Sequence, residues 1–207
     1  MLVIGLTGGI GSGKTTAGEM LKEMGAAYLN ADLLGHEMLK PPSLLLEQII
    51  TAFGKSYLLP SGELNRKRLG EKVFKDRKAL ARLNKIMHPA MLEAVKGKIE
   101  EWRKTGYKIG VVEAAALIEA GWDEVMDEVW VTTAPREIII ERLQKNKSLS
   151  REEIISRMNS QLSDTERQKK AAVIINTSGS LSMLQERVAE LYDEAVYRSD
   201  KMKEGIE

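Results

Sequence analysis

The sequence has 207 residues, of which 43% are hydrophobic and 29% charged, proportions ordinary for a soluble globular protein, which argues against disorder or a fibrous structure. Its 31 Lys and Arg residues nearly balance its 30 Asp and Glu residues, and a net charge of +1 argues against general affinity for nucleic acid. The lack of cysteine excludes disulfides, cysteine metal sites and thiol nucleophiles. With no apolar stretch of about 20 residues and no signal-peptide pattern, we expect a cytoplasmic protein with one domain over 1–207.

The first expected strand covers the apolar residues 2–6, and a glycine-rich segment follows it directly. This segment, residues 8–15, reads GGIGSGKT and matches the phosphate-binding pattern G-x-x-x-x-G-K-[ST]. Residues 16–24 are typical of a helix, so the strand, the turn and the helix come in the order in which backbone N–H groups and a helix N-terminus bind phosphate. The residues expected to bind nucleotide phosphates are Gly8, Gly9, Gly11, Ser12, Gly13, Lys14, Thr15 and Thr16.

Within this loop, we expect Lys14 to reach the β- and γ-phosphates of a nucleotide and the Thr15 hydroxyl to ligate Mg²⁺. The alternative is a glycine-rich surface turn that happens to precede a lysine. The dinucleotide fingerprint G-x-G-x-x-G fits less well, because Thr16 stands where its third glycine should be. A nicotinamide or flavin cofactor is therefore disfavoured.

Apolar, strand-like runs alternate with helical segments along the chain. Such alternation predicts an α/β fold with a parallel sheet that helices cover on both faces. The third and fifth runs contain continuously apolar stretches, as central parallel strands do. Ligands of such sheets bind at the carboxyl ends of the strands, so the residues just after each run are candidates for a site. The expected strands are residues 2–6, 26–30, 107–114, 127–133 and 172–176.

Two carboxylates lie where expected strands end. Asp32 comes just after the second run, where it could accept the proton of a hydroxyl group, cap a helix over 33–40, or do both. Glu113 lies at the end of the third run. A buried glutamate without a cation would be costly, which favours a role for Glu113, with Thr15, in holding Mg²⁺.

Between the second and third expected strands, residues 33–105 contain no convincing strand and should form a helical layer of their own. We expect Pro41-Pro42 to break its first helix and Pro89 to end a later one. This insertion could simply cover the sheet or could bind a second substrate. Its two histidines, His36 and His88, have no metal-ligand spacing and are typical of structural residues. One face of a further helix is marked by Met91, Val95, Ile99 and Trp102.

The later part of the chain carries two S-x-x-E capping boxes, at 150–153 and 163–166, and each predicts the start of a short helix. Basic residues gather on the preceding helix, expected over 135–147. The region 143–171 could therefore be a lid that closes over phosphates, or a solvated helical surface. The last helix is expected to pack on the sheet through Leu181, Leu184, Val188, Leu191 and Ala195.

Several stretches taken together resemble the dephospho-CoA kinase family. Besides the loop with its flanks (5–16), they include Asn30-Ala31-Asp32 with His36, and residues 62–66, which read GELNR. The loop alone is generic to P-loop kinases, whereas its combination with the other elements and His88-Pro89 is specific to this family. Further matches, in order along nearly the whole chain, are Phe53-Gly54, Val73-Phe74, Glu119-Ala120-Gly121-Trp122, Gln161 and Asn176.

The resemblance implies a three-layer P-loop kinase fold with a parallel five-stranded sheet, a helical acceptor-binding insertion over 33–105 and a lid over 143–171. It implies that ATP phosphorylates the ribose 3′-hydroxyl of dephospho-CoA, giving CoA and ADP in the last step of coenzyme A biosynthesis, with Mg²⁺ required. The expected partners are therefore ATP and dephospho-CoA, with neither nucleic acid nor membrane.

By residue, the resemblance implies that Lys14 contacts the ATP phosphates, that Asp32 is the catalytic carboxylate and that Arg142 reaches in from the lid. It assigns Arg66 and His88, with Asp32, to the acceptor. Arg66 belongs to a cluster of cations suited to the acceptor's diphosphate, which also contains Lys67, Arg68 and Lys72. Four positions depart from the family pattern, Asn30, Asn65, Ala115 and Lys145, where Asp, Asp, Pro and Arg are usual.

Two other functions stay open at this point: another P-loop nucleotide or small-molecule kinase, or a P-loop nucleotide sensor without transferase activity. The guanine-binding motif Asn-Lys-x-Asp is not matched at 146–149, which weakens the GTPase form of the sensor. ADP release that depends on an added acceptor would distinguish the enzyme from the sensor.

Overall fold

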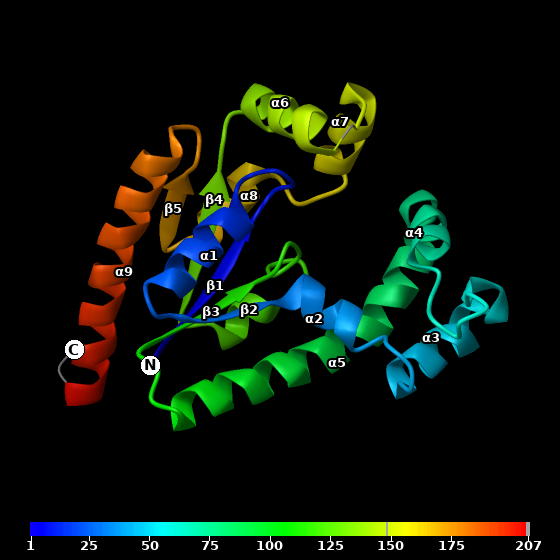
Figure 1. The fold of residues 1–207 in the computed structure, drawn as a ribbon, viewed down its shortest axis with the longest axis horizontal. Coiled ribbons are helices and arrows are strands. Elements are labelled where there is room, and N and C mark those ends of the chain that lie inside the picture. Colours follow the sequence, from blue (N-terminus) through cyan, green and yellow to red (C-terminus); the bar gives the residue numbers. More distant parts are fainter. Residues whose placement is uncertain (148, 206–207) are drawn as a thin grey trace. The chain divides into compact units, whose positions relative to one another are not determined.

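The computed structural model describes residues 1–147 and 149–205, which form two compact units (Figure 1). Unit 1 combines residues 1–30 with 98–207, and unit 2 is residues 31–97. Unit 2 covers most of the segment expected as a helical insertion. Ser148, which belongs to the predicted lid region, lies outside the described residues.

Unit 1 is built on a parallel sheet of five strands in the order β2-β3-β1-β4-β5, which confirms the α/β fold. Every residue of β1 and of β3 is buried, as expected for central parallel strands. The fifth run, in contrast, is an edge strand, and its Ile174 is 46% exposed. The strands are β1 (Leu2–Gly8), β2 (Ala27–Asn30), β3 (Ile109–Glu113), β4 (Glu128–Thr133) and β5 (Val173–Asn176).

Helices α1 (Lys14–Glu23) and α9 (Leu181–Glu204) pack on the sheet through a shared apolar core (Figure 1). The predicted face of the last helix is confirmed at four positions. Leu181 is the exception, being 65% exposed, because it is the first residue after the Ser180 N-cap and points away from the core. The buried residues that α9 contributes are Leu184, Val188, Leu191 and Ala195.

The segment between β4 and β5 holds three helices, α6 (Arg136–Lys147), α7 (Arg151–Asn159) and α8 (Asp164–Lys170). Both predicted capping boxes are present, with Ser150 and Ser163 as the N-caps. Helices α6 and α7 share a small apolar cluster of their own. Its buried residues are Ala134, Ile139, Ile140, Leu143 and Ile154.

Unit 2 is helical in the described structure and has its own apolar core, formed around Ile49, Leu69 and Val73. A single antiparallel bridge joins Leu58 to Leu64. The elements of this part of the chain are α2 (Ala31–Glu37), α3 (Leu44–Phe53), the 3₁₀ helix η1 (Lys55–Tyr57), α4 (Arg66–Lys75) and α5 (Arg77–Lys104), which extends into unit 1; a second 3₁₀ helix, η2 (Trp122–Val125), belongs to unit 1.

Two helix boundaries predicted in this region are wrong. Pro89 does not end a helix but lies inside α5. A proline removes one backbone hydrogen bond, and here apolar packing on both sides of it, by Met87 and Met91 among others, continues the helix. Asp32 does not cap α2, since that helix starts at Ala31 and Asp32 lies in its first turn. The predicted apolar face of the later helix is confirmed, because Met91, Val95, Ile99 and Trp102 are all buried.

Candidate active site

The glycine-rich loop joins the end of β1 to the start of α1, where Gly13 is the N-cap in the left-handed conformation (φ 86°). No side chain caps α1, so the N–H groups of its first turn point to the loop without a side-chain acceptor. A Cβ on Gly8 would lie 2.4 Å from Thr132 Oγ1 and 2.5 Å from the Thr132 carbonyl oxygen. The close approach at Gly8 and the positive φ at Gly13 therefore require glycine. The geometry is that of an anion-binding loop.

Two threonines hold this loop against the sheet. Ser12 is buried, and its hydroxyl lies 2.7 Å from the hydroxyl of Thr132, the fifth residue of β4. Thr177 follows β5 directly and donates a 2.9 Å hydrogen bond to the Ser12 carbonyl oxygen. Sequence reasoning missed both threonines, although the rule that polar residues at carboxyl ends of strands mark a site would have found them. The loop is thus fixed before any ligand arrives.

Lys14 Nζ donates hydrogen bonds to the carbonyl oxygens of Gly8 (2.9 Å) and Gly9 (3.0 Å). The ammonium group is therefore held over the loop and not extended into solvent. This position suits a cation that neutralises phosphate charge at the loop.

Glu113, at the end of β3, is 2% exposed, and its carboxylate accepts hydrogen bonds from three neutral groups. Thr15 Oγ1 donates at 2.8 Å, Asn30 Nδ2 at 3.1 Å, and the Tyr28 hydroxyl also donates. Burial, and then the hydrogen bond to and charge of Glu113, raise the pKa of Tyr28 far above its ordinary value. These donors satisfy Glu113 within the protein, so its burial alone does not require a metal ion.

The fit to Mg²⁺ rests on the oxygen atoms themselves. The structure brings the two predicted ligands, Thr15 and Glu113, into contact, and a hydroxyl and a carboxylate are oxygen donors that Mg²⁺ prefers. Among residues 1–147 and 149–205, no group of three or more acidic or histidine side chains could hold a metal ion. The residues therefore fit an ion that takes its remaining ligands from nucleotide phosphates and water, as Mg²⁺ usually does.

Arg142, on α6, donates to Oγ1 of Thr177 at 3.1 Å and also to the Thr177 carbonyl oxygen. Thr177 in turn donates to the Ser12 carbonyl oxygen, so a single residue, Thr177, links the Arg142 guanidinium to the phosphate loop. Arg142, which the family resemblance implies reaches in from the lid side, is thus connected to the loop through Thr177. Lys145, where the family usually has arginine, is exposed on the same helix.

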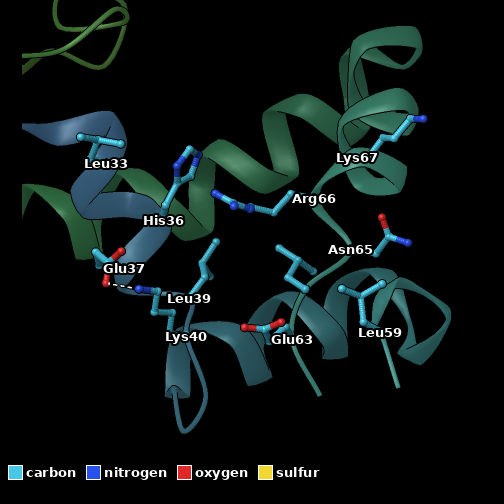
Figure 2. Close-up of a pocket in the computed structure, with 11 residues that line it drawn as sticks. Leu33, His36, Glu37, Leu39, Lys40, Leu59, Glu63, Asn65, Arg66 and Lys67 are labelled. Atoms are coloured by element: carbon cyan, nitrogen blue, oxygen red, sulfur yellow. Dashed lines mark ion pairs between the residues drawn. The ribbon is translucent and has the colours of Figure 1, made fainter. Parts of the chain in front are cut away.

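Unit 2 contains a pocket of about 630 Å³ between α2 and the start of α4 (Figure 2). Figure 2 shows Arg66 extending toward His36 and marks an ion pair between Glu37 and Lys40. The Lys40 Nζ lies 2.6 Å from Oε2 of Glu37. Burial, and then the charge of Arg66, lower the pKa of His36, while the carboxylates of Asp32 and Glu37 oppose this effect. The pocket is lined by Leu33, His36, Glu37, Leu39, Lys40, Leu59, Glu63, Leu64, Asn65, Arg66 and Lys67.

The four predicted cations of unit 2 divide into two pairs. Arg66 and Lys67 line the pocket. Arg68 instead donates to the Ser56 carbonyl oxygen at 2.7 Å and lies over the Tyr57 ring, and Lys72 pairs with Asp76 at 2.9 Å. The second pair therefore contacts other groups of unit 2 and does not line the pocket. Asn65, a departure from the family pattern, is the N-cap of α4, and its side chain accepts from the Arg68 N–H at 3.0 Å.

The predicted site residues thus belong to two groups. Lys14, Thr15, Glu113 and Arg142 belong to unit 1, with the loop. Asp32, Arg66 and His88 belong to unit 2, and of these only Arg66 lines the pocket in the described structure. His88 is half-buried on α5, and Asp32 is exposed.

Comparisons with known proteins agree with one another. A family model described as dephospho-CoA kinase matches residues 2–183. A dephospho-CoA kinase of Dehalococcoides mccartyi is 44% identical over 178 residues, which cover 86% of this chain and 89% of the relative. One of Geobacter sulfurreducens is 38% identical over 93% of this chain and 98% of the relative. The solved structure of a dephospho-CoA kinase from Campylobacter jejuni aligns over 94% of this chain and 97% of its own, with a TM-score of 0.70 and 26% identity.

Proposed function

Because the chain belongs to the dephospho-CoA kinase family, we propose that its phosphate loop and its unit 2 pocket bind the two substrates of that reaction. The protein is a kinase that uses ATP to phosphorylate dephospho-CoA in coenzyme A biosynthesis. We assign the transferred phosphoryl group to the 3′-hydroxyl of the acceptor's ribose. The single observation that supports ATP binding at the loop is the hydrogen bond from Thr15, in the loop, to the carboxylate of Glu113, at the end of β3.

On the donor side, the loop N–H groups and Lys14 would bind the ATP phosphates, and Thr15 and Glu113 would hold Mg²⁺, directly or through water. When bound, Mg²⁺ supplies positive charge at the phosphate oxygens and keeps them in line with the acceptor. Thr177 orients Arg142 toward the loop, where a second cation would offset charge on the moving phosphoryl group.

On the acceptor side, Asp32 would accept the proton of the attacking ribose hydroxyl. The new bond from the ribose oxygen to the γ-phosphorus forms as the bond from that phosphorus to the β–γ bridging oxygen breaks, and ADP is the leaving group. The exposure of Asp32 on the first turn of α2 leaves its carboxylate accessible to a substrate. A contact between His88 and the acceptor stays a prediction from the family resemblance.

The pocket supports this assignment by its chemistry. Dephospho-CoA carries a diphosphate and a long, partly apolar arm. Arg66 and Lys67 supply cations at the pocket, whereas Lys40 is paired with Glu37, and leucines supply its apolar wall. The volume of about 630 Å³ is within the range of small-molecule sites. We assign the diphosphate to Arg66, which can bind phosphate oxygens with two parallel donors.

A cytoplasmic location and the absence of nucleic-acid partners are proposals that rest on composition and charge balance. Among the described helices, none is both long and apolar enough to cross a membrane.

An acceptor panel tests the function. ADP release is measured with dephospho-CoA, AMP, adenosine, shikimate and gluconate at equal concentration. We expect turnover with dephospho-CoA and far less with the others. If AMP were turned over as fast as dephospho-CoA, the substrate assignment would be wrong and the protein would be a P-loop kinase of another specificity. If ADP release did not depend on any acceptor, a nucleotide sensor or a hydrolase would be favoured.

A further inference from the structure

The junction between α7 and α8 folds onto the phosphate loop. Gln161 Oε1 accepts a 2.8 Å hydrogen bond from the backbone N–H of Ile10, inside the loop. A Cβ built on Gly9 would lie within ordinary contact distance of three side chains of this junction: Asp164 Oδ1 at 3.6 Å, Arg167 Nη1 at 3.7 Å and Gln161 Oε1 at 3.8 Å. We call residues 161–167 the brace.

The centre of the brace is a buried arginine. The side chain of Arg167 is 2% exposed, with Nη2 3.3 Å from Glu119 Oε1 and Nη1 3.3 Å from Asp164 Oδ1. Its Nε has no hydrogen-bond partner, the one such buried side-chain atom in the described part of the chain. Removing a guanidinium from water is costly, and two long ion pairs with one unpaired donor compensate for it poorly. Stability alone therefore does not explain why this position is an arginine.

Glu119 ties the brace to the loop that follows β3. Its Oε1 accepts from Arg167 and also from the backbone N–H of Leu162 at 3.1 Å. One carboxylate thus fixes both ends of the brace, and it comes from the segment that follows Glu113. Glu119 and Gln161 belong to stretches that resemble the family, and these contacts give both residues a structural role.

We propose that Arg167 is a positioning residue for nucleotide binding. Its guanidinium, together with Glu119, fixes the brace so that Gln161 holds the Ile10 N–H, and the Gly9-Ile10 side of the loop then keeps the conformation that receives the phosphates of ATP. This role rests on the proposed function only in that the loop binds a nucleotide. It does not depend on which acceptor is phosphorylated.

The test uses the variants Arg167→Met and Gln161→Leu, with Arg187→Met as the control. Methionine is apolar and of similar length, so it removes the fork of donors while filling the buried space. Arg187 is an exposed arginine on α9 that pairs with Glu190, so its replacement makes the same change of charge away from the loop. Arg167→Lys keeps the charge but lacks the rigid fork that pairs with both carboxylates.

Two measurements are made on each full-length variant: the Kd for Mg·ADP by calorimetry, and the amide exchange rate of Ile10 by NMR. We expect Arg167→Met and Gln161→Leu to raise the Kd by roughly tenfold or more and to speed exchange at Ile10, since small misplacements of a binding group cost up to about 10². For Arg167→Lys, the Kd and the Ile10 exchange rate should lie between those of wild type and Arg167→Met. For Arg187→Met, both should match the wild type. KM for dephospho-CoA should change less than the Kd for Mg·ADP.

A merely structural role predicts a different pattern. Arg167→Met would then lower Tm and the folded fraction, while the remaining folded protein would bind Mg·ADP normally. Gln161→Leu covers the case in which Arg167→Met does not fold. An unchanged Kd and unchanged Ile10 exchange in the folded variants would overturn the proposal. Because both readouts work without an acceptor, a failed substrate assignment would not affect them.

Discussion

The Thr15 hydroxyl donates a 2.8 Å hydrogen bond to Oε1 of Glu113. Thr15 is the second residue of α1 and Glu113 is the last residue of β3, so the bond joins the end of the phosphate loop to the carboxyl end of a neighbouring strand. The two side chains meet because β1 and β3 pair in parallel, with Leu6 opposite Glu113. The contact brings together the two residues that the sequence predicts as joint Mg²⁺ ligands.

Thr15→Val should weaken Mg²⁺ binding and raise the Mg²⁺ concentration needed for activity, because valine has the shape of threonine but no oxygen to ligate the ion. We expect kcat at saturating ATP to fall by roughly 10²-fold, as when one transition-state electrostatic group is lost. Mg²⁺ titrations of activity and of ADP binding measure the effect. Thr15→Ser restores the hydroxyl and should recover most of the loss. Equal Mg²⁺ affinity in Thr15→Val and wild type would contradict the assignment of Thr15.

Asp32→Asn keeps the size of the side chain but removes its ability to take a proton. We expect kcat to drop by roughly 10²–10⁴ while the Kd for Mg·ATP stays nearly unchanged, the usual pattern for a lost general base. Steady-state kinetics and calorimetry check the two quantities. If ATP binding collapsed while kcat at saturation survived, Asp32 would have a metal-binding or structural role and not that of the base.

Arg66→Ala should raise KM for dephospho-CoA more than KM for ATP, because Arg66 lines the unit 2 pocket and its proposed contact is remote from the transferred phosphoryl group. Lys75→Ala is the matched control, since Lys75 is an exposed cation of α4 outside the pocket lining. We expect at least a roughly tenfold rise in KM for the acceptor, the loss of about 1.4 kcal/mol of binding. An effect of Arg66→Ala confined to ATP would exclude the pocket as the acceptor site.

His36 gives a prediction on pH. Its folded-state pKa lies below the ordinary value of 6.5, so the unfolded chain binds the proton more tightly. The contribution of His36 to stability is therefore complete above pH 6.5 and is lost as pH falls through that value toward the folded-state pKa. Arg66→Ala removes one cause of the lowering, so an NMR titration should find a higher His36 pKa than in wild type, and Lys75→Ala should leave it unchanged. A lower or equal pKa in Arg66→Ala would show that Arg66 does not act on His36.

Much of unit 1 could be predicted from the sequence because its signals are local. Apolar runs marked the five strands, and the capping boxes marked the starts of α7 and α8. The loop pattern predicted the glycine-rich turn between β1 and α1, and the rule for strand ends predicted that Glu113 lies near it. These signals depend on spacing alone, and tertiary packing did not change them.

The rest depends on contacts between residues far apart in the chain. That Tyr28 and Asn30 donate to Glu113, that Thr177 reaches Ser12, and that Pro89 lies inside a helix all follow from packing that no local pattern encodes. The division of the unit 2 cations is of the same kind, since Arg66 and Arg68 differ only in what surrounds them.

The most direct test of the central claim is the product of the reaction. Wild-type protein is incubated with Mg·ATP and dephospho-CoA, and the products are followed by ³¹P NMR, with Lys14→Ala as the variant that lacks the loop cation. We predict one ADP for each new phosphomonoester on the ribose 3′ position, and a rate in Lys14→Ala that is lower by about 10²-fold or more, while its fold by circular dichroism is unchanged. Release of phosphate without a new phosphomonoester, or a Lys14→Ala rate close to that of wild type, would contradict the account.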